Sequence, residues 1–199
     1  RVPLTEVAGI SEREVQRLID RRPFSSLSDA IGRAELSRPV AENLVVTGAF
    51  DALHPSPVTR RDLLLQVADI DRHTRSTGID TQLSFDLLGS TAEYVPITGL
   101  PEMKASDRVR SEMSVLGLDV SAHVVDFYKD LLSEMRATAA CDLLKQRSGS
   151  DVWVAGVKVA IQSPPVRSGR RVIFVTLDDS TGPIDAAFFD DVQENYAST

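Results

Sequence analysis

The sequence predicts a multi-domain α + β protein in which helices come first and a small β-rich part follows. Apolar residues recur at helical spacing in the first fifty residues and in several later segments. From residue 151 the period becomes strand-like, with β-branched residues gathered in three short runs. Stretches containing Pro, Gly and Ser separate these regions. We therefore expect four parts, at residues 1–53, 54–100, 101–148 and 149–199.

Composition narrows the classes of function. The 199 residues carry a formal net charge of −7, so contact with nucleic acid has to come from local basic patches or backbone amides. A single cysteine, Cys141, excludes an internal disulfide and a cysteine-cluster zinc site. No apolar run approaches a membrane span and no signal peptide is visible, so we expect a cytoplasmic protein without a membrane partner. Because the chain begins with Arg1 rather than Met, we expect it to be part of a longer protein.

Three helices are expected within residues 1–53. Ser11 has the character of an N-cap, and Glu14 three residues later completes the capping-box pattern. Pro23 ends this first helix. The second helix is expected to begin near Ser26 or Ser28, and the third to run from about Ser37 to Thr47. Gly48 is expected to be the C-cap glycine of the third helix.

The turn Val7-Ala8-Gly9-Ile10, directly before the first helix, has the apolar-x-Gly-apolar pattern of a helix-hairpin-helix module. Gly9 lets the main chain approach a phosphate, and the free N–H groups at the next helix start bind the anion. The arginines that follow and could reach further phosphates are Arg13, Arg17, Arg21 and Arg22. The alternative is a glycine turn between packed helices with solvated arginines, and the nearby acids Glu6, Glu12 and Glu14 dilute the basic patch.

The region 54–100 begins with a break at His54-Pro55-Ser56-Pro57. A helix is expected from Arg61 to Arg75, with an apolar side formed by Leu64, Leu65, Ala68 and Val67. From Ser76 to Gly99 the composition predicts an extended, mobile stretch. Further helices are expected from Pro101 to Leu116, capped by Gly117, and over Val124–Leu132 and Thr138–Lys145.

Within that stretch, a glutamine is followed by spaced apolar residues, a pattern that can insert into a hydrophobic groove of a partner protein. The candidate docking residues are Gln82, Leu83, Ser84, Phe85 and Leu87. The alternative is a short apolar anchor that packs on the chain's own helices.

The β-rich part predicts the first three strands of an OB-fold, a five-stranded barrel that commonly binds single-stranded nucleic acid. Its expected turns are Pro164–Arg171 and Asp178–Gly182, and a last helix is expected over Asp190–Ala197. Candidate stacking residues are Trp153, Phe174, Phe188 and Phe189, of which we expect Phe174 and Phe188 to lie in the core. Arg167, Arg170 and Arg171 could line a groove for the nucleic-acid backbone. With three strands the barrel is incomplete, so the fold class is a helix-hairpin-helix region followed by a partial OB-fold.

Catalytic constellations are not visible. The histidines His54, His73 and His123 lack metal-ligand spacing. The pairs Asp178-Asp179 and Asp190-Asp191 would suit a magnesium-dependent hydrolase or nuclease, but they fall at turn and helix-start positions, where Asp is common for structural reasons. We therefore predict no catalytic residue, no metal site and no cofactor in this segment.

Taken in order, these segments resemble the C-terminal part of bacterial DNA polymerase III alpha subunits, the C-family polymerases. The segments that carry the resemblance are Val7–Ile10 with Pro23–Asp29, Thr47–Asp51, Glu112–Leu118 with Ser121–His123, and Phe174–Gly182. The glutamine segment is similar to the six-residue sliding-clamp-binding motif of this family, with Phe85 where Leu is usual.

The resemblance implies a parent polymerase, nearer the error-prone type, whose magnesium-binding catalytic domain lies upstream of Arg1. This segment would bind double-stranded and single-stranded DNA and the bacterial sliding clamp, in replication or repair, without catalysis of its own. The alternative is a freestanding helix-hairpin-helix and OB-fold adaptor of DNA repair.

Overall fold

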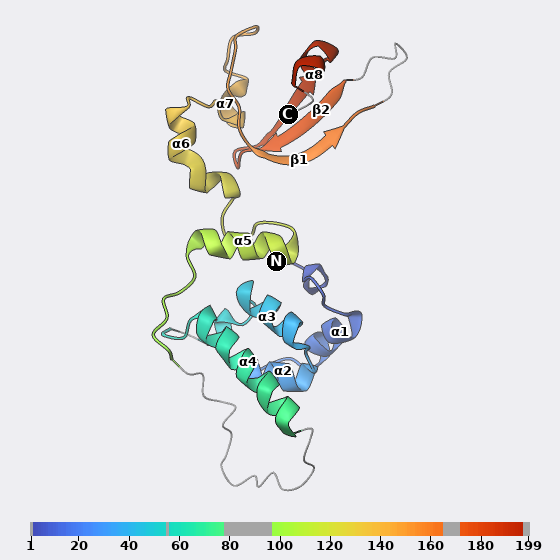
Figure 1. Ribbon diagram of the computed structural model, residues 1–199, viewed down its shortest axis with the longest axis vertical. Coiled ribbons are helices and arrows are strands. Elements are labelled where there is room, and N and C mark those ends of the chain that lie inside the picture. The colour runs from blue at the N-terminus through green and yellow to red at the C-terminus, as the bar shows by residue number, and fades with distance from the viewer. Residues whose placement is uncertain (1, 55, 78–96, 165–171, 197–199) are drawn as a thin grey trace. The chain divides into compact units, whose positions relative to one another are not determined.

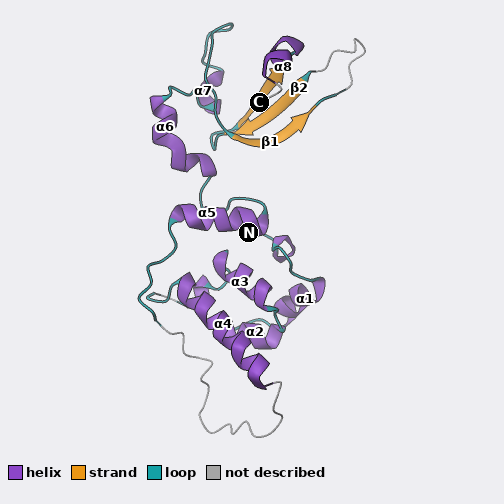
Figure 2. Ribbon diagram, in the orientation of Figure 1, coloured by secondary structure: helices purple, strands orange, loops and turns teal. Residues whose placement is uncertain are grey.

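The computed structural model describes residues 2–54, 56–77, 97–164 and 172–196 (Figures 1 and 2). The chain forms two compact units, residues 1–121 and 122–199. The first is helical and the second contains a small sheet. The four-part division expected from the sequence stays a prediction. Within the described residues, no helix is both long enough and apolar enough to cross a membrane.

The helical unit follows the expected order of elements. Ser11, Ser26 and Ser37 are the N-caps of its first three α-helices, and Gly48 has a φ of 82° just beyond the third. These positions confirm the predicted boundaries. The Ser11 and Ser26 hydroxyls accept from backbone N–H groups in the first turns of α1 and α2, and a left-handed glycine follows α3. Ser37 has no side-chain cap and instead donates to Glu14. The elements are η1 Leu4–Glu6, α1 Glu12–Asp20, α2 Leu27–Ala34, α3 Arg38–Val46, η2 Asp51–Leu53, α4 Arg60–Thr77 and α5 Ala105–Leu116.

The buried side of α4 differs from the predicted one. Leu63 and Val67 are buried, whereas Leu65 is 43% exposed. Residues four apart share a helix face, and Leu65 lies two residues from each, on nearly the opposite side. The predicted apolar side therefore missed Leu63 and wrongly included Leu65.

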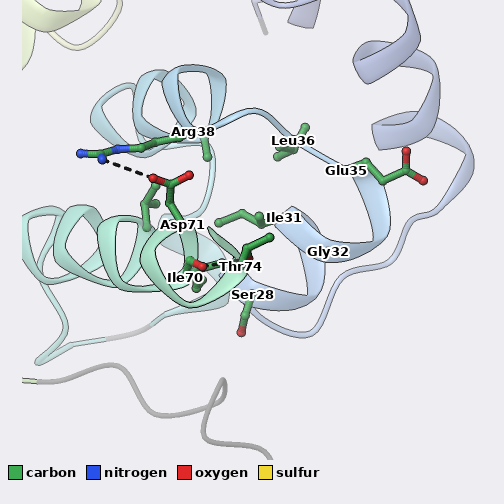
Figure 3. Close-up of a pocket in the computed structure, with 11 residues that line it drawn as sticks. Ser28, Ile31, Gly32, Glu35, Leu36, Arg38, Ile70, Asp71 and Thr74 are labelled. Atoms are coloured by element: carbon green, nitrogen blue, oxygen red, sulfur yellow. Dashed lines mark hydrogen bonds and ion pairs between the residues drawn. The ribbon is translucent and has the colours of Figure 1, made fainter. Parts of the chain in front are cut away.

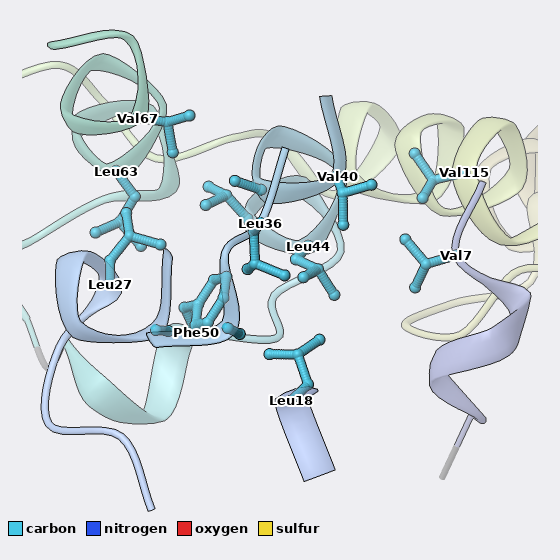
Figure 4. Packing of buried hydrophobic residues seen from close by; sticks show 14 residues of the cluster. Val7, Leu18, Leu27, Leu36, Val40, Leu44, Phe50, Leu63, Val67 and Val115 are labelled. Carbon is cyan, nitrogen blue, oxygen red and sulfur yellow. The ribbon is translucent and has the colours of Figure 1, made fainter. Parts of the chain in front are cut away.

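The core of this unit lies where α2, α3 and α4 meet (Figure 4). Leu27, Leu44 and Leu63 supply one almost fully buried leucine from each of these helices. Val7 and Val115 extend the same apolar cluster to the turn before α1 and to α5. The turn is thus packed on the unit's core.

Glu14 is a buried acid that joins α1 to α3. One carboxylate oxygen accepts hydrogen bonds from the Ser11 N–H at 2.9 Å and its hydroxyl at 2.7 Å. The other accepts from the Ser37 N–H at 2.9 Å and its hydroxyl at 3.0 Å. Burial by itself raises the pKa of Glu14, but these hydrogen bonds outweigh it and lower the pKa from 4.5 to about 2.

Two further buried acids accept several hydrogen bonds each. Asp62 accepts from the N–H and hydroxyl of Thr59, both at 2.9 Å, and from those of Thr98 at 3.1 and 2.5 Å. Glu112 accepts from the Val120 and Ser121 N–H groups, both at 2.8 Å. Asp62 fixes the chain that precedes α5 to the start of α4, and Glu112 fixes the chain that follows α5.

The second unit holds a three-stranded antiparallel sheet in the order β1-β2-β3, as predicted for three consecutive strands. A bulge interrupts β1 between Lys158 and Ala160. The first strand begins at Val157, later than the β-branched run that starts at Val152. The elements are η4 Val124–Tyr128, α6 Lys129–Glu134, α7 Ala140–Leu143, β1 Val157–Gln162, β2 Ile173–Asp178, β3 Pro183–Phe188 and α8 Asp190–Tyr196.

The expectation that Phe174 and Phe188 lie in the core is wrong for this structure. Phe174 is 42% exposed and Phe188 is 37% exposed. Phe188 pairs with Ile173, the neighbour of Phe174, so the two rings lie on opposite faces of the sheet. Within the described residues, neither face is covered well enough to bury its phenylalanine.

We expect Glu14→Gln to destabilise the helical unit by about 2 kcal/mol at pH 7, because the neutral amide cannot accept from both serines as the carboxylate does. A folded-state pKa of about 2, below the usual 4.5, means that the contribution is complete above 4.5 and is lost as pH falls toward 2. Urea unfolding followed by circular dichroism at 222 nm, at pH 7 and pH 3, measures both effects.

The matched control is Glu12→Gln, an exposed acid in the first turn of the same helix. It should change the free energy of unfolding by less than about 0.5 kcal/mol. Equal losses in the two variants would show that the contacts of Glu14 with Ser11 and Ser37 do not stabilise the unit.

Candidate nucleic-acid interface

The turn Val7–Ile10, called the first hairpin below, connects η1 to α1. Gly9 has a φ of 78°, a conformation that other residues adopt only with strain. Beyond its chain neighbours, no atom lies within 4 Å of the position that a Cβ on Gly9 would take. The glycine backbone therefore faces open space beside the start of α1.

Contacts from distant parts of the unit hold this hairpin. The Ala8 N–H donates to the Val115 carbonyl on α5 at 2.9 Å, and the Asn43 side-chain amide on α3 donates to the Ala8 carbonyl at 2.9 Å. Inside the turn, the Ile10 N–H donates to the Val7 carbonyl at 3.1 Å. The first hairpin is thus held by two helices, α3 and α5, and by one hydrogen bond within the turn. Asn43 was not among the residues expected from the sequence, because no local pattern marks it.

The four arginines predicted to reach phosphates divide into two pairs. Arg13 and Arg22 are exposed. Arg17 instead donates to the Ala34 carbonyl at 2.6 Å and the Glu35 carbonyl at 3.1 Å, and Arg21 donates to the Arg33 carbonyl. These carbonyls belong to the end of α2, where a helix leaves them unpaired. Arg17 and Arg21 therefore join α1 to α2, and their role as phosphate ligands stays a prediction.

The turn that follows α3 is organised by Arg60, which sequence reasoning also missed. This buried guanidinium donates to the Val46 carbonyl at 2.8 Å and to Asp51 at 2.7 Å. It occupies the space that a Cβ on Gly48 would need. Each of three residues in the segment Gly48–Asp51 thus has a structural role. Gly48 leaves room for the Arg60 side chain, and Asp51 pairs with Arg60. Phe50 is buried in the core.

A pocket of about 490 Å³ lies between α2, α3 and α4 (Figure 3). Ile31, Leu36 and Val67 give it an apolar lining. At the pocket the Arg38 guanidinium forms an ion pair with Asp71 at 3.4 Å. None of the residues predicted from the sequence as binding residues lines it.

In the second unit, Trp153 is the most accessible of the predicted stacking residues, at 72% exposed. Phe189 is exposed as well. The Trp153 carbonyl accepts a hydrogen bond from the Thr138 N–H at 2.7 Å, which holds its backbone. The three arginines predicted for a backbone groove, Arg167, Arg170 and Arg171, lie outside the described residues. So do the predicted docking residues Gln82, Leu83, Ser84, Phe85 and Leu87.

Asp179 is engaged in structural contacts rather than directed at a metal. One of its oxygens accepts from the Ala140 N–H at 2.7 Å, and the other accepts from Thr181 and Gly182. Burial raises the pKa of Asp179, but these hydrogen bonds outweigh it and lower the pKa. Its neighbour Asp178 accepts from the Ser180 N–H at 2.9 Å. Among the described residues, no three His, Cys, Asp or Glu side chains form a group that could hold a metal ion.

We expect Arg17→Gln to destabilise the helical unit by about 1–2 kcal/mol, because the helix-end carbonyls of α2 lose charged donors. Arg13→Gln removes the same charge from an exposed position of the same helix and should cost less than about 0.5 kcal/mol. Thermal and urea unfolding at 222 nm would compare the two. Equal stability of both variants would mean that Arg17 does not hold α2.

Comparisons with known proteins agree with this architecture. Residues 1–63 match the family model described as helix-hairpin-helix motif, and residues 152–199 match that of the OB-fold nucleic acid binding domain. The chain is 34% identical to an error-prone DNA polymerase of Symbiobacterium thermophilum and 31% identical to one of Rhodopirellula baltica, over 98% of its length in both cases. It is 28% identical, over 96% of its length, to a DNA polymerase III subunit alpha of Haemophilus influenzae.

The chain spans only 20%, 16% and 17% of these three relatives, respectively. The predicted fold class is confirmed, since a helix-hairpin-helix region precedes an OB-fold domain of which three strands are described. The predicted resemblance is confirmed as well. Over nearly its whole length, this sequence is similar to one region of error-prone DNA polymerases and of DNA polymerase III alpha subunits.

Proposed function

We propose that this chain is the DNA-binding and sliding-clamp-docking region of a bacterial DNA polymerase of the III alpha type, and that it has no catalytic activity of its own. The observation that carries the proposal is the first hairpin, where Gly9 has a φ of 78° and faces open space in a region that matches the helix-hairpin-helix motif. The names of the relatives support a polymerase over a freestanding repair adaptor.

Duplex DNA would be held through its phosphates. A phosphate beside Gly9 would accept from backbone N–H groups at the start of α1, where the helix dipole favours an anion. Arg13 and Arg22 are exposed, and their guanidinium groups would add further contacts. Such contacts carry no base information, as a polymerase that acts on every sequence requires.

Single-stranded template would be held by the OB-fold unit. The exposed indole of Trp153 and the exposed ring of Phe189 are suited to stacking on bases, which is tolerant of sequence. Arg167, Arg170 and Arg171 would neutralise the backbone. This part of the proposal is supported by the match of residues 152–199 to a nucleic acid binding family.

Docking to the sliding clamp is assigned to Gln82, Leu83, Ser84, Phe85 and Leu87. The support is the sequence pattern and its place in the chain, between the end of α4 at Thr77 and Thr98, which is bound to Asp62. Magnesium and the catalytic aspartates would belong to the remainder of a cytoplasmic polymerase. The alternative of a magnesium-dependent nuclease is not favoured, because Asp179 is committed to structural hydrogen bonds.

Gly9→Ala together with Arg13→Gln should weaken binding of a mixed-sequence duplex about 10-fold at 50 mM salt, with a smaller loss at 200 mM, since about one counterion is released per phosphate contact. Fluorescence anisotropy with a labelled duplex measures this. Arg72→Gln, an equal charge change on α4, is the control and should have little effect. Unchanged affinity in the Gly9 and Arg13 variant would contradict duplex binding by the first hairpin.

Gln82→Ala together with Leu87→Ala should weaken binding to a bacterial sliding clamp at least about 10-fold, because the motif loses its polar anchor and an apolar one. Isothermal calorimetry with the purified clamp gives the affinity. Asp86→Asn changes a position between the apolar anchors and serves as the matched control. Clamp affinity that survives the double substitution would place the docking site elsewhere.

A further inference from the structure

We propose that α3 and α5 belong to the duplex-binding site, because they set the direction of the Gly9 N–H, and that Asn43 is the positioning residue. The inference rests on the proposed binding of duplex DNA by the first hairpin. It extends the site beyond the residues that match the helix-hairpin-helix motif, which end at residue 63, to α5 at residues 105–116.

The peptide group between Ala8 and Gly9 determines the direction of the Gly9 N–H. The Ala8 carbonyl and the Gly9 N–H are the two ends of the same trans peptide, so they point in opposite directions. The Asn43 amide donates to that carbonyl at 2.9 Å and so fixes it toward α3. The Gly9 N–H therefore points away from α3, and within the described residues it has no hydrogen-bond partner.

The preceding peptide group is fixed by α5. The Ala8 N–H donates to the Val115 carbonyl, which lies in the last turn of α5 and has no acceptor role within that helix. The carbonyl at the other end of this peptide, that of Val7, accepts from the Ile10 N–H and closes the turn. The buried side chains of Val7 and Val115 face one another in Figure 4. Two successive peptide groups are thus oriented by helices outside the hairpin.

This arrangement pre-organises an anion site. A phosphate oxygen beside Gly9 would meet an N–H whose direction is already set, so little ordering is needed on binding. The Asn43 amide donates to the Ala8 carbonyl, so Asn43 would not contact DNA itself. Its effect on affinity would therefore depend on an intact Gly9 conformation.

The test compares four full-length chains: unchanged, Asn43→Ala, Gly9→Ala and the double variant. The probe is a labelled mixed-sequence duplex, titrated by anisotropy between 50 and 200 mM salt. Asn43→Ala should weaken binding about 3- to 10-fold, with the fold preserved because Ala favours a helix and the amide lies at the surface of α3. The slope of log affinity against log salt should stay nearly unchanged, because the Gly9 N–H is uncharged and only contacts of phosphates with Lys or Arg release counterions.

The double variant shows whether Asn43 affects binding through the first hairpin or independently of it. If Asn43 acts through the hairpin, adding Asn43→Ala to Gly9→Ala should change affinity less than about twofold, since the same contact is already lost. Asn43→Gln, which keeps an amide donor, should recover part of the affinity. Ser114→Ala, an exposed change on α5 beside Val115, should leave binding unchanged.

The outcomes separate this inference from the proposed function. Losses that multiply in the double variant, or a salt slope that falls by about 0.9 in Asn43→Ala as it would for a lost arginine contact, would overturn the role of Asn43 while leaving duplex binding by the hairpin in place. Full affinity in the Gly9→Ala chain would instead remove the hairpin as the duplex site, and the inference with it.

Discussion

Buried carboxyl groups that accept several hydrogen bonds each are the interaction on which the helical unit depends. An acid can stay charged away from water only when donors surround it, and donors of this kind are abundant at the starts of helices. Glu14 takes four from Ser11 and Ser37, and so fixes the start of α1 against the start of α3. Since α3 carries Asn43, this one acid also determines where the first hairpin is held. Asp62 and Glu112 extend the same principle to the chain on either side of α5.

Because of these contacts, the net charge of −7 for the whole chain does not describe the charge on the surface near the first hairpin. Glu14, Asp62 and Glu112 are buried, so none of them lies on the surface that a phosphate would contact. The same holds for part of the positive charge, because Arg17 and Arg21 bind the end of α2. What remains near the hairpin is a small patch in which backbone N–H groups matter more than the number of cations. Binding through such a patch is local and independent of base sequence.

The sequence predicts the features that depend on residues close together in the chain. The caps at Ser11, Ser26 and Gly48 follow from side-chain oxygens and a glycine within a few residues of the helix ends they satisfy, and the three strands follow from β-branched runs. Prediction failed where tertiary packing decides. The buried side of α4 depends on which face α2 and α3 cover, and the exposure of Phe174 depends on what lies over the sheet. Asn43 meets Ala8 across 35 positions, a contact for which a single sequence holds no pattern.

The proposed small duplex site is consistent with the proposed docking to a partner. A hairpin with one directed N–H and one exposed arginine, Arg13, on the helix that follows would bind weakly, and weak, sequence-independent contact lets a protein move along DNA. A second attachment through the proposed docking residues would raise the local concentration of the hairpin at the duplex, as linking two binding sites does. Weak contacts then suffice for continuous association. The rigid mounting of the hairpin on α3 and α5 fits this division, because a site with few contacts gains most when each is already in place.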